Sequence, residues 1–132
     1  MNVRQRPLPT PAPPYDPRRV NEVSRVQAPA IVRELVELLG ARLTADIADV
    51  SDTRHVRAWE NEEQSPQRLD ALKAALQAAR VISDVEGRDV ARGWFAGCNV
   101  HFEFRSPADI LRENTPESRT AVVLAAHQEV SS

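Results

Sequence analysis

The chain is poor in the residues from which disulfide frameworks, phosphate loops and large aromatic cores are built. Cys98 is the only cysteine among 132 residues, which excludes an intramolecular disulfide. Aromatic residues make up 5% of the chain, and its four glycines form no phosphate-binding pattern. No apolar run approaches the roughly 18 residues of a membrane span, and no secretory-type stretch follows the N-terminal arginines. We therefore expect a cytoplasmic protein that makes no contact with a membrane.

The chain also lacks a large excess of charge of either sign. Its formal net charge is −2, so bulk charge does not favour binding to nucleic acid, and any such contact needs a local basic patch. Apolar residues make up 42% of the chain, and Leu, Ala and Val dominate among them. Residues of this kind favour helices packed on helices. Length and composition together predict one mostly helical domain, or one domain with a tail.

Groups of the catalytic and metal-binding kinds are equally scarce. Cys98 and His101 are spaced like half of a zinc site, but the sequence contains no second Cys/His pair. Nucleophilic catalysis by Cys98 would need a positioned base and a third, orienting group, and a buried thiol beside Gly97 is the simpler expectation. We predict no catalytic residue, no metal, no cofactor and no enzymatic activity.

Proline is concentrated near the N-terminus. Seven of the ten prolines lie between Pro7 and Pro29, and each removes a backbone donor and fixes φ. Residues 1–29 are therefore expected to form a disordered or extended Pro/Arg-rich arm. This segment carries five arginines against two acids, which suits either a solubilising tail or an arm that follows a phosphate backbone. Arg18 and Arg19 are its candidate phosphate contacts.

Residues 30–64 have the layout of a helix-turn-helix. Apolar residues at positions 31, 35, 38 and 39 follow helical spacing and predict a first helix that ends near Gly40. A short apolar turn of helix follows, and then a tight connection in which Ser51 or Asp52 can cap the next helix. A helix, a short helix, a tight turn and a second short helix are the parts of this motif.

The last of these helices presents polar side chains on its outer face. Val56 and Trp59 lie three residues apart and share an inward face, while Arg54, Arg57 and Asn61 fall opposite them. Two guanidinium groups and an amide are suited to base edges and phosphates in a DNA major groove, although an ordinary solvated face has the same pattern. The candidate DNA-binding residues of this helix are Arg54, His55, Arg57 and Asn61.

Residues 65–132 are expected to form a helical linker and a small helical domain. Three Ser/Thr-Pro pairs, at positions 65–66, 106–107 and 115–116, each predict the start of a helix. The segment from Val100 to Phe104 alternates apolar and polar residues, which favours a short strand or an extended linker. The chain as a whole is predicted to be all-α, with five or six helices. The expected core comprises Leu35, Leu38, Ile47, Val56, Trp59, Leu72, Leu76, Trp94 and Leu111.

Two runs of the sequence resemble the two halves of a known family of bacterial antitoxins. The run LTADIADVSDTRHVRAWENEEQSP resembles the Xre-type helix-turn-helix of that family. The run VARGWFAGCNVHFEFRSPADILREN resembles its ParS/MbcA-like toxin-binding domain, with Trp94, Asn99 and the pair Ser106–Pro107 in the family's order. The resemblance covers about residues 31–130 and leaves out the proline-rich segment.

The resemblance implies a cytoplasmic homodimer that binds double-stranded operator DNA in its own promoter and neutralises a cognate protein toxin. The usual toxin of such a pair belongs to the RES class, which consumes NAD, and the C-terminal part of the antitoxin covers its active site. The segment from Trp94 to the C-terminus is therefore the candidate toxin-binding surface. Its candidate contact residues are Asn99, Phe102, Phe104, Ser106, Val130 and Ser132.

Two other functions remain compatible with the same residues. From residue 31 to residue 66 there are four arginines against eight acids, which is a poor balance for a phosphate-binding surface. This balance favours a protein-binding module whose helix-turn-helix no longer contacts DNA. A stand-alone transcriptional regulator, such as one encoded by a prophage, would use the same fold without a toxin. An adjacent gene with a RES-like pattern would favour the antitoxin.

Overall fold

The computed structural model describes residues 17–131, with the side chains of residues 27–131. In this part of the chain it contains seven α-helices, which exceeds the predicted five or six, and no strand, so the predicted all-α fold is confirmed. None of these helices is both long and apolar enough to cross a membrane. The elements are, in chain order, α1 (Pro17–Leu39), α2 (Ala41–Ile47), α3 (Thr53–Glu60), α4 (Leu69–Glu86), α5 (Arg88–Ala96), the 3-10 turn η1 (Val100–Phe102), α6 (Pro107–Arg112) and α7 (Pro116–Ser131).

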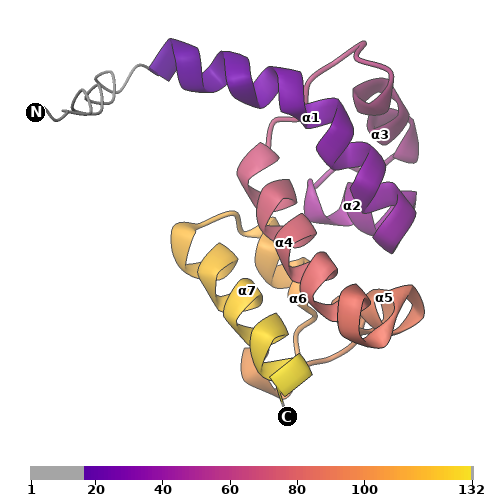
Figure 1. The fold of residues 1–132 in the computed structure, drawn as a ribbon, viewed down its shortest axis with the longest axis vertical. Helices are drawn as coiled ribbons and strands as arrows, with labels where there is room; N and C mark the ends of the chain where they lie inside the picture. Colours follow the sequence, from indigo (N-terminus) through magenta and orange to yellow (C-terminus); the bar gives the residue numbers. More distant parts are fainter. Residues whose placement is uncertain (1–16, 132) are drawn as a thin grey trace, which may run out of the picture.

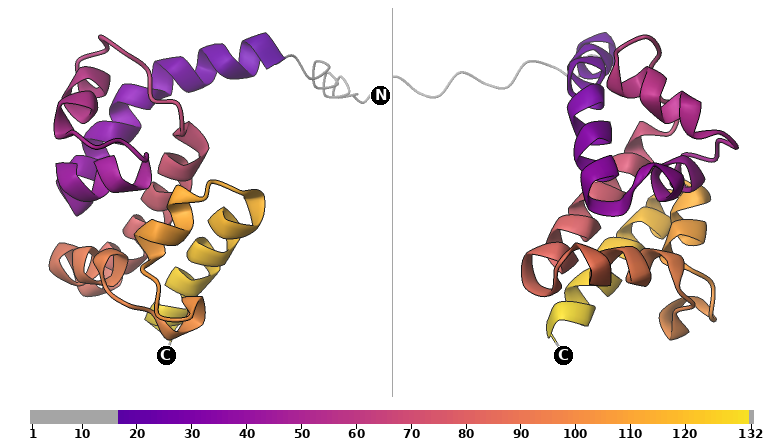
Figure 2. Two further views of the ribbon diagram at one scale, coloured as in Figure 1. Left: turned by 180° about the vertical axis from the view of Figure 1, so that it is seen from behind. Right: turned by 90° about the vertical axis from the view of Figure 1, so that its right-hand side faces the viewer.

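The helices gather into two groups that are joined by α4 (Figure 1). α1, α2 and α3 lie together at one end, whereas α5, α6 and α7 lie at the other. The two views in Figure 2 show the same division. α4 packs against both α1 and α7, and the buried apolar residues of both groups form one continuous core.

The predicted core is largely confirmed, with one exchange on α5. Leu38 and Trp94 are only partly buried at its edge, whereas Phe95 is completely buried. Trp94 packs against Phe95 edge to face, with ring centroids 5.1 Å apart. Successive helical residues differ by about 100° in direction, so only one of two adjacent aromatics can face the core. The predicted residues that are buried are Leu35, Ile47, Val56, Trp59, Leu72, Leu76 and Leu111.

The first helix begins earlier than the proline pattern suggested. α1 starts at Pro17 and continues through Pro29, near which helical order was expected to begin. Proline is tolerated at the first position of a helix, whereas an internal proline removes one backbone hydrogen bond and crowds the carbonyl group of the preceding turn. Ala28 and Val32 are buried on either side of Pro29. The remainder of the predicted arm, residues 1–16, lies outside the described residues.

Two local predictions in the second half of the chain are wrong. The pair at residues 65–66 does not start a helix, because α4 begins only at Leu69. Arg68 is anchored instead, donating to the Arg112 carbonyl oxygen at 2.5 Å and pairing with Asp49 at 3.5 Å. Residues 100–104 form neither a strand nor an extended linker, since they fold into η1 and a left-handed turn. The other two Ser/Thr-Pro pairs start α6 and α7 as predicted.

Candidate interaction surfaces

The exposed positions of α3 include the candidate DNA-binding residues of the predicted helix-turn-helix. The apolar pair on the inner face is buried, as predicted. Arg54, His55 and Arg57 are exposed along the helix. Asn61 is the exposed C-cap, and its backbone N–H donates to the Arg57 carbonyl oxygen at 3.0 Å. The structure therefore places four of the six candidates on α3 and its C-cap. The side chains of Arg18 and Arg19 lie outside the described residues.

Arg54 is held by the carboxylate at the start of α3. Asp52 is the N-cap, and one of its oxygens accepts from the Arg54 backbone N–H at 2.8 Å. Its other oxygen accepts from the Arg54 side-chain Nε at 2.8 Å and lies 2.7 Å from Nη2. The hydrogen bond from Arg54 lowers the pKa of Asp52, and Asp52 raises the pKa of Arg54. Both groups are charged near neutral pH. Arg54 therefore already has an anionic partner, although its side chain is 86% exposed.

Arg57 differs from Arg54 in this respect. Within residues 27–131 its side chain takes part in no ion pair, and it is exposed in the last turn of α3. The loop that follows carries the exposed Glu62 and Glu63, which lower the local potential near the end of the helix. Arg57 is thus the arginine of α3 that is available to a ligand.

Asn99 organises the loop between α5 and α6. Its side-chain oxygen accepts from the His101 backbone N–H at 2.9 Å and caps η1. Its carbonyl oxygen accepts from the N–H groups of Phe102 at 3.0 Å and Phe104 at 2.8 Å, and its own N–H donates to the Arg105 carbonyl oxygen at 3.2 Å. Four hydrogen bonds therefore converge on this one residue, whose predicted role was contact with a partner.

The other predicted partner-binding residues occupy very different environments. Phe102 and Val130 are partly buried and pack against the core. Ser106 caps α6, because its hydroxyl accepts from the Asp109 N–H at 3.1 Å. Phe104 is 69% exposed. Ser132 lies outside the described residues.

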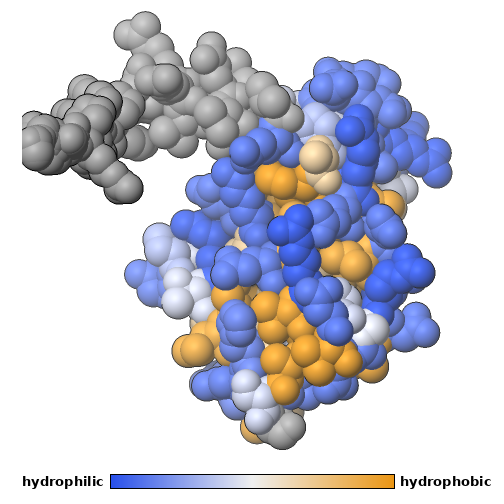
Figure 3. Space-filling view, in the orientation of Figure 1, coloured by the Kyte–Doolittle hydropathy of each residue, from blue (hydrophilic) through white to orange (hydrophobic). Residues whose placement is uncertain are grey.

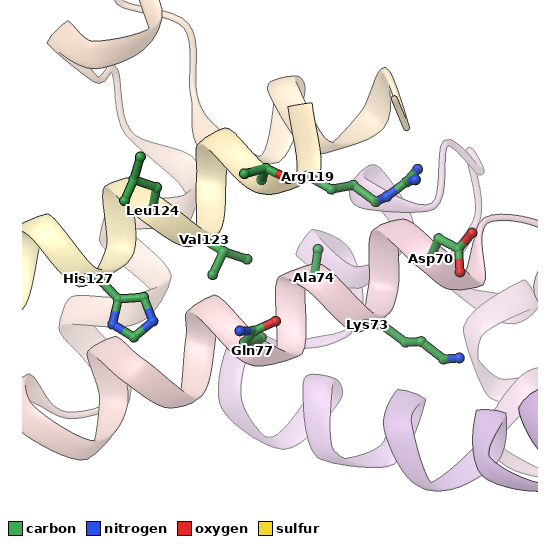
Figure 4. Close-up of a pocket in the computed structure, with 9 residues that line it drawn as sticks. Asp70, Lys73, Ala74, Gln77, Arg119, Val123, Leu124 and His127 are labelled. Carbon is green, nitrogen blue, oxygen red and sulfur yellow. The ribbon is translucent and has the colours of Figure 1, made fainter. Parts of the chain in front are cut away.

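A shallow groove between α4 and α7 was not predicted from the sequence. It encloses about 670 Å³, and Figure 4 shows Val123 and His127 of α7 pointing toward Ala74 and Gln77 of α4. The remaining lining residues are Asp70, Lys73, Arg119, Thr120 and Leu124. Apolar residues also gather over α4 and α7 on the face shown in Figure 3. The sequence signal that indicates it is the run of three apolar residues at positions 122–124, because one inward face of a helix cannot bury all three.

The thiol and histidine chemistry considered above finds no support in the geometry. Cys98 is exposed, which contradicts the expectation of a buried thiol; it directly follows the C-cap of α5. Among the side chains of residues 27–131, no group of three or more His, Cys, Asp or Glu is arranged to hold a metal ion.

Comparisons with known proteins give one informative result. No protein-family model and no curated protein matches the chain. A chain in the crystal structure of the M. tuberculosis MbcT-MbcA toxin-antitoxin complex is similar to it, with 30% sequence identity and a TM-score of 0.59. The match covers 77% of the present chain and 95% of the matched chain.

Proposed function

Because this chain belongs to the MbcA-like antitoxin family, we propose that it is the DNA-binding antitoxin of a toxin–antitoxin pair. In this proposal it neutralises a cognate toxin of the RES class, which consumes NAD, and represses its own promoter as a homodimer. The observation that carries the antitoxin role is the likeness in both sequence and fold over nearly all of the matched chain. The all-helical fold agrees with it.

The C-terminal half of the chain supplies the surface proposed for the toxin. α7 carries apolar residues on two sides: Val122 and Ala126 are buried in the core, while Leu124 is 56% exposed. Leu124 therefore adds apolar area to the side of α7 that faces away from the core, and a partner can cover such area. The groove between α4 and α7 adjoins this exposed side, and a protein partner seated there would remove the apolar surface from water.

Neutralisation is tested by expressing the chain together with the toxin encoded in the adjoining reading frame. Growth and cellular NAD are measured with the toxin alone, with the toxin and this chain, and with the toxin and an unrelated helical protein. We expect growth and cellular NAD to be restored when the toxin is expressed with this chain, but not when it is expressed with the unrelated helical protein. Depletion of NAD that persists despite formation of a stable complex would refute the antitoxin role.

DNA binding rests on the layout of α1, α2 and α3 and on the exposed arginine of α3. A helix whose outer face is free and whose inner face is buried can enter a major groove. The test is the fluorescence anisotropy of labelled promoter DNA at low and high salt, with size-exclusion chromatography coupled to light scattering to measure the oligomeric state. We expect a dimer whose affinity for DNA falls with salt.

One observation favours a second candidate, a protein-binding module that does not contact DNA. The ion pair between Asp52 and Arg54 occupies one of the two arginines of α3, and the loop that follows the other arginine carries two exposed acids, Glu62 and Glu63. Under this alternative the chain neutralises its toxin, but promoter DNA shows no salt-sensitive binding at all. The same anisotropy measurement therefore decides between the two candidates.

A further inference from the structure

The loop of residues 98–105 exposes an aromatic side chain from a backbone that disfavours it. Glu103 and Phe104 have φ values of +55° and +68°, so two consecutive residues other than glycine adopt the left-handed region. This region is uncommon for residues with a Cβ and is a genuine outlier for bulky ones, whereas asparagine and glycine accept it readily. Phe104 is also 69% exposed, so its ring gains little from burial in this chain.

The loop is rigidly built around this exposed ring. Asn99 joins its two ends through the four hydrogen bonds described above, and Phe102 fixes its middle to the core. Arg105 pairs with Glu113 beyond α6 at 2.5 Å, which fixes the far end. Val100 is 70% exposed on the same loop and adds a second apolar side chain. Backbone strain that the surrounding structure maintains, at an exposed apolar residue, is typical of a binding site.

We propose that this loop is a preformed recognition knob in which Phe104 enters an apolar pocket of the toxin, with Val100 at its rim. Asn99 acts as a positioning residue that holds the knob in shape and makes no contact itself. The inference rests on the proposed antitoxin function and refines it, because it separates the residue that touches the partner from the residue that shapes the loop. Large aromatic side chains in pockets commonly dominate protein interfaces.

The charges of the loop favour a protein pocket over a lipid surface. Glu103 is exposed and negative beside the ring, while the guanidinium of Arg105 is already paired with Glu113. A membrane-binding loop needs free cations near anionic headgroups, and this loop presents none. A rigid loop also loses little conformational freedom on binding, which improves the affinity for a pocket of matching shape.

The decisive variant is Phe104→Asn, which removes the ring and suits the left-handed backbone. We expect its melting temperature to rise by about 2–5 °C because strain is relieved. We expect its affinity for the toxin from the adjoining reading frame, measured by calorimetry, to fall by about 30-fold or more. Glu103→Asn is the matched control, since it relieves the same strain at the neighbouring position but keeps the ring. It should melt higher and bind like the wild type.

The role of Asn99 is tested by a pair of substitutions. Asn99→Ala removes the acceptor for the His101 N–H and should weaken toxin binding by about 3- to 30-fold. Asn99→Asp retains an oxygen acceptor at the same position and should restore binding to within about twofold of the wild type. A residue in direct contact through its amide would not be rescued by the carboxylate.

Several outcomes would overturn the inference. A lower melting temperature for Phe104→Asn would mean that the ring serves the fold. Unchanged toxin affinity in this variant, with the wild type binding normally, would mean that the toxin is held elsewhere. A shift of Phe104→Asn from dimer to monomer, with toxin affinity retained, would assign the knob to a second copy of this chain. Failure of the wild type itself to bind would refute the antitoxin function and this inference together.

Discussion

Asp52 performs two tasks at the start of α3. Its side chain caps the helix, and it also binds the guanidinium of Arg54. Both the cap and the exposed arginine were predicted from the sequence, but their contact was not, because residues two positions apart meet only when the cap has this geometry. The charge of Arg54 is consequently offset by a partner that the helix itself requires.

Replacing Asp52 with serine should strengthen DNA binding. Serine keeps an oxygen acceptor at the N-cap, so the helix is retained, and the loss of the carboxylate releases Arg54 for phosphate or base contacts. We expect a tighter complex with promoter DNA, and a plot of log affinity against log salt that steepens by about one unit. The measurement is anisotropy across a salt series.

The control for this prediction is Asp46→Ser on α2. Asp46 pairs with Arg42 at 2.7 Å. This change therefore removes one negative charge from the same region but leaves the ion pair between Asp52 and Arg54 intact. Equal gains in DNA affinity from both variants would assign the effect to net charge and contradict a specific role for Arg54.

The two glycines of the α5 region should respond oppositely to alanine. A Cβ at Gly97 would lie 2.9 Å from the Gly93 carbonyl oxygen, which belongs to the backbone and cannot swing aside, whereas a Cβ at Gly93 meets nothing within 4 Å. Gly97→Ala should lower the free energy of unfolding by about 1–3 kcal/mol. Gly93→Ala, inside the helix, should raise it by about 0.5–1 kcal/mol. Urea denaturation measures both, and equal effects of the two variants would place the end of α5 elsewhere.

Among the helices, those with a chemical start signal and a clear apolar stripe were predictable. Ser106 and Thr115 cap helices that begin with proline, and both starts are confirmed. Ser65 has the same signal and fails, because the contacts of Arg68 with residues far along the chain fix the preceding segment in another conformation. Local signals carry no information about such contacts. The conformation of the knob loop was not predicted for the same reason. Its alternation of apolar and polar residues is typical of an extended segment, whereas the hydrogen bonds of Asn99 fold it into a closed turn.

The packing of α1 on α4 includes one ion pair whose strength should depend on pH. Arg80 donates from Nε and Nη2 to the two carboxylate oxygens of Glu34, both at 2.5 Å. This hydrogen bonding lowers the pKa of Glu34 below its ordinary value of 4.5. Because the pKa is lower in the folded state than in the unfolded state, the pair stabilises the fold above that value, and its contribution is lost as the pH falls through the folded pKa.

Glu34→Gln should therefore destabilise the protein at pH 7 but not in acid. Both side chains are more than a third exposed, so the loss at pH 7 should be less than about 1 kcal/mol. The difference between the melting temperatures of the wild type and the variant should shrink as the pH falls below 4.5, and it should vanish below the folded-state pKa of Glu34. Glu37→Gln is the control, because Glu37 is 3.9 Å from its partner Arg88 and 71% exposed. A pH-independent difference for Glu34→Gln would show that packing and not charge is lost.

Across the whole molecule, one core joins the two groups of helices, and this limits how function can be dissected. Deletion of the chain beyond Thr120 would remove Val122, Ala125 and Ala126 from the core. The shortened protein would therefore lose stability together with any binding surface, since buried apolar residues commonly cost several kcal/mol when removed. Substitutions of exposed residues can change binding without this loss of stability.

Two such substitutions should separate DNA binding from neutralisation, because α3 and α7 lie at different ends of the molecule (Figures 1 and 2). Arg57→Ala removes the unpaired arginine of α3 and should weaken promoter binding by about 1–3 kcal/mol while toxin neutralisation persists. Leu124→Asp places a charge on the exposed side of α7 and should abolish neutralisation while DNA binding and the melting temperature are kept. Val90 is also an exposed apolar residue, but it lies on α5, so Val90→Asp is the control for an added charge.

Anisotropy and the growth assay are run on all three variants. If Arg57→Ala released the toxin, or Leu124→Asp released DNA, the two surfaces would be coupled and the assignment of one function to each end of the molecule would be wrong.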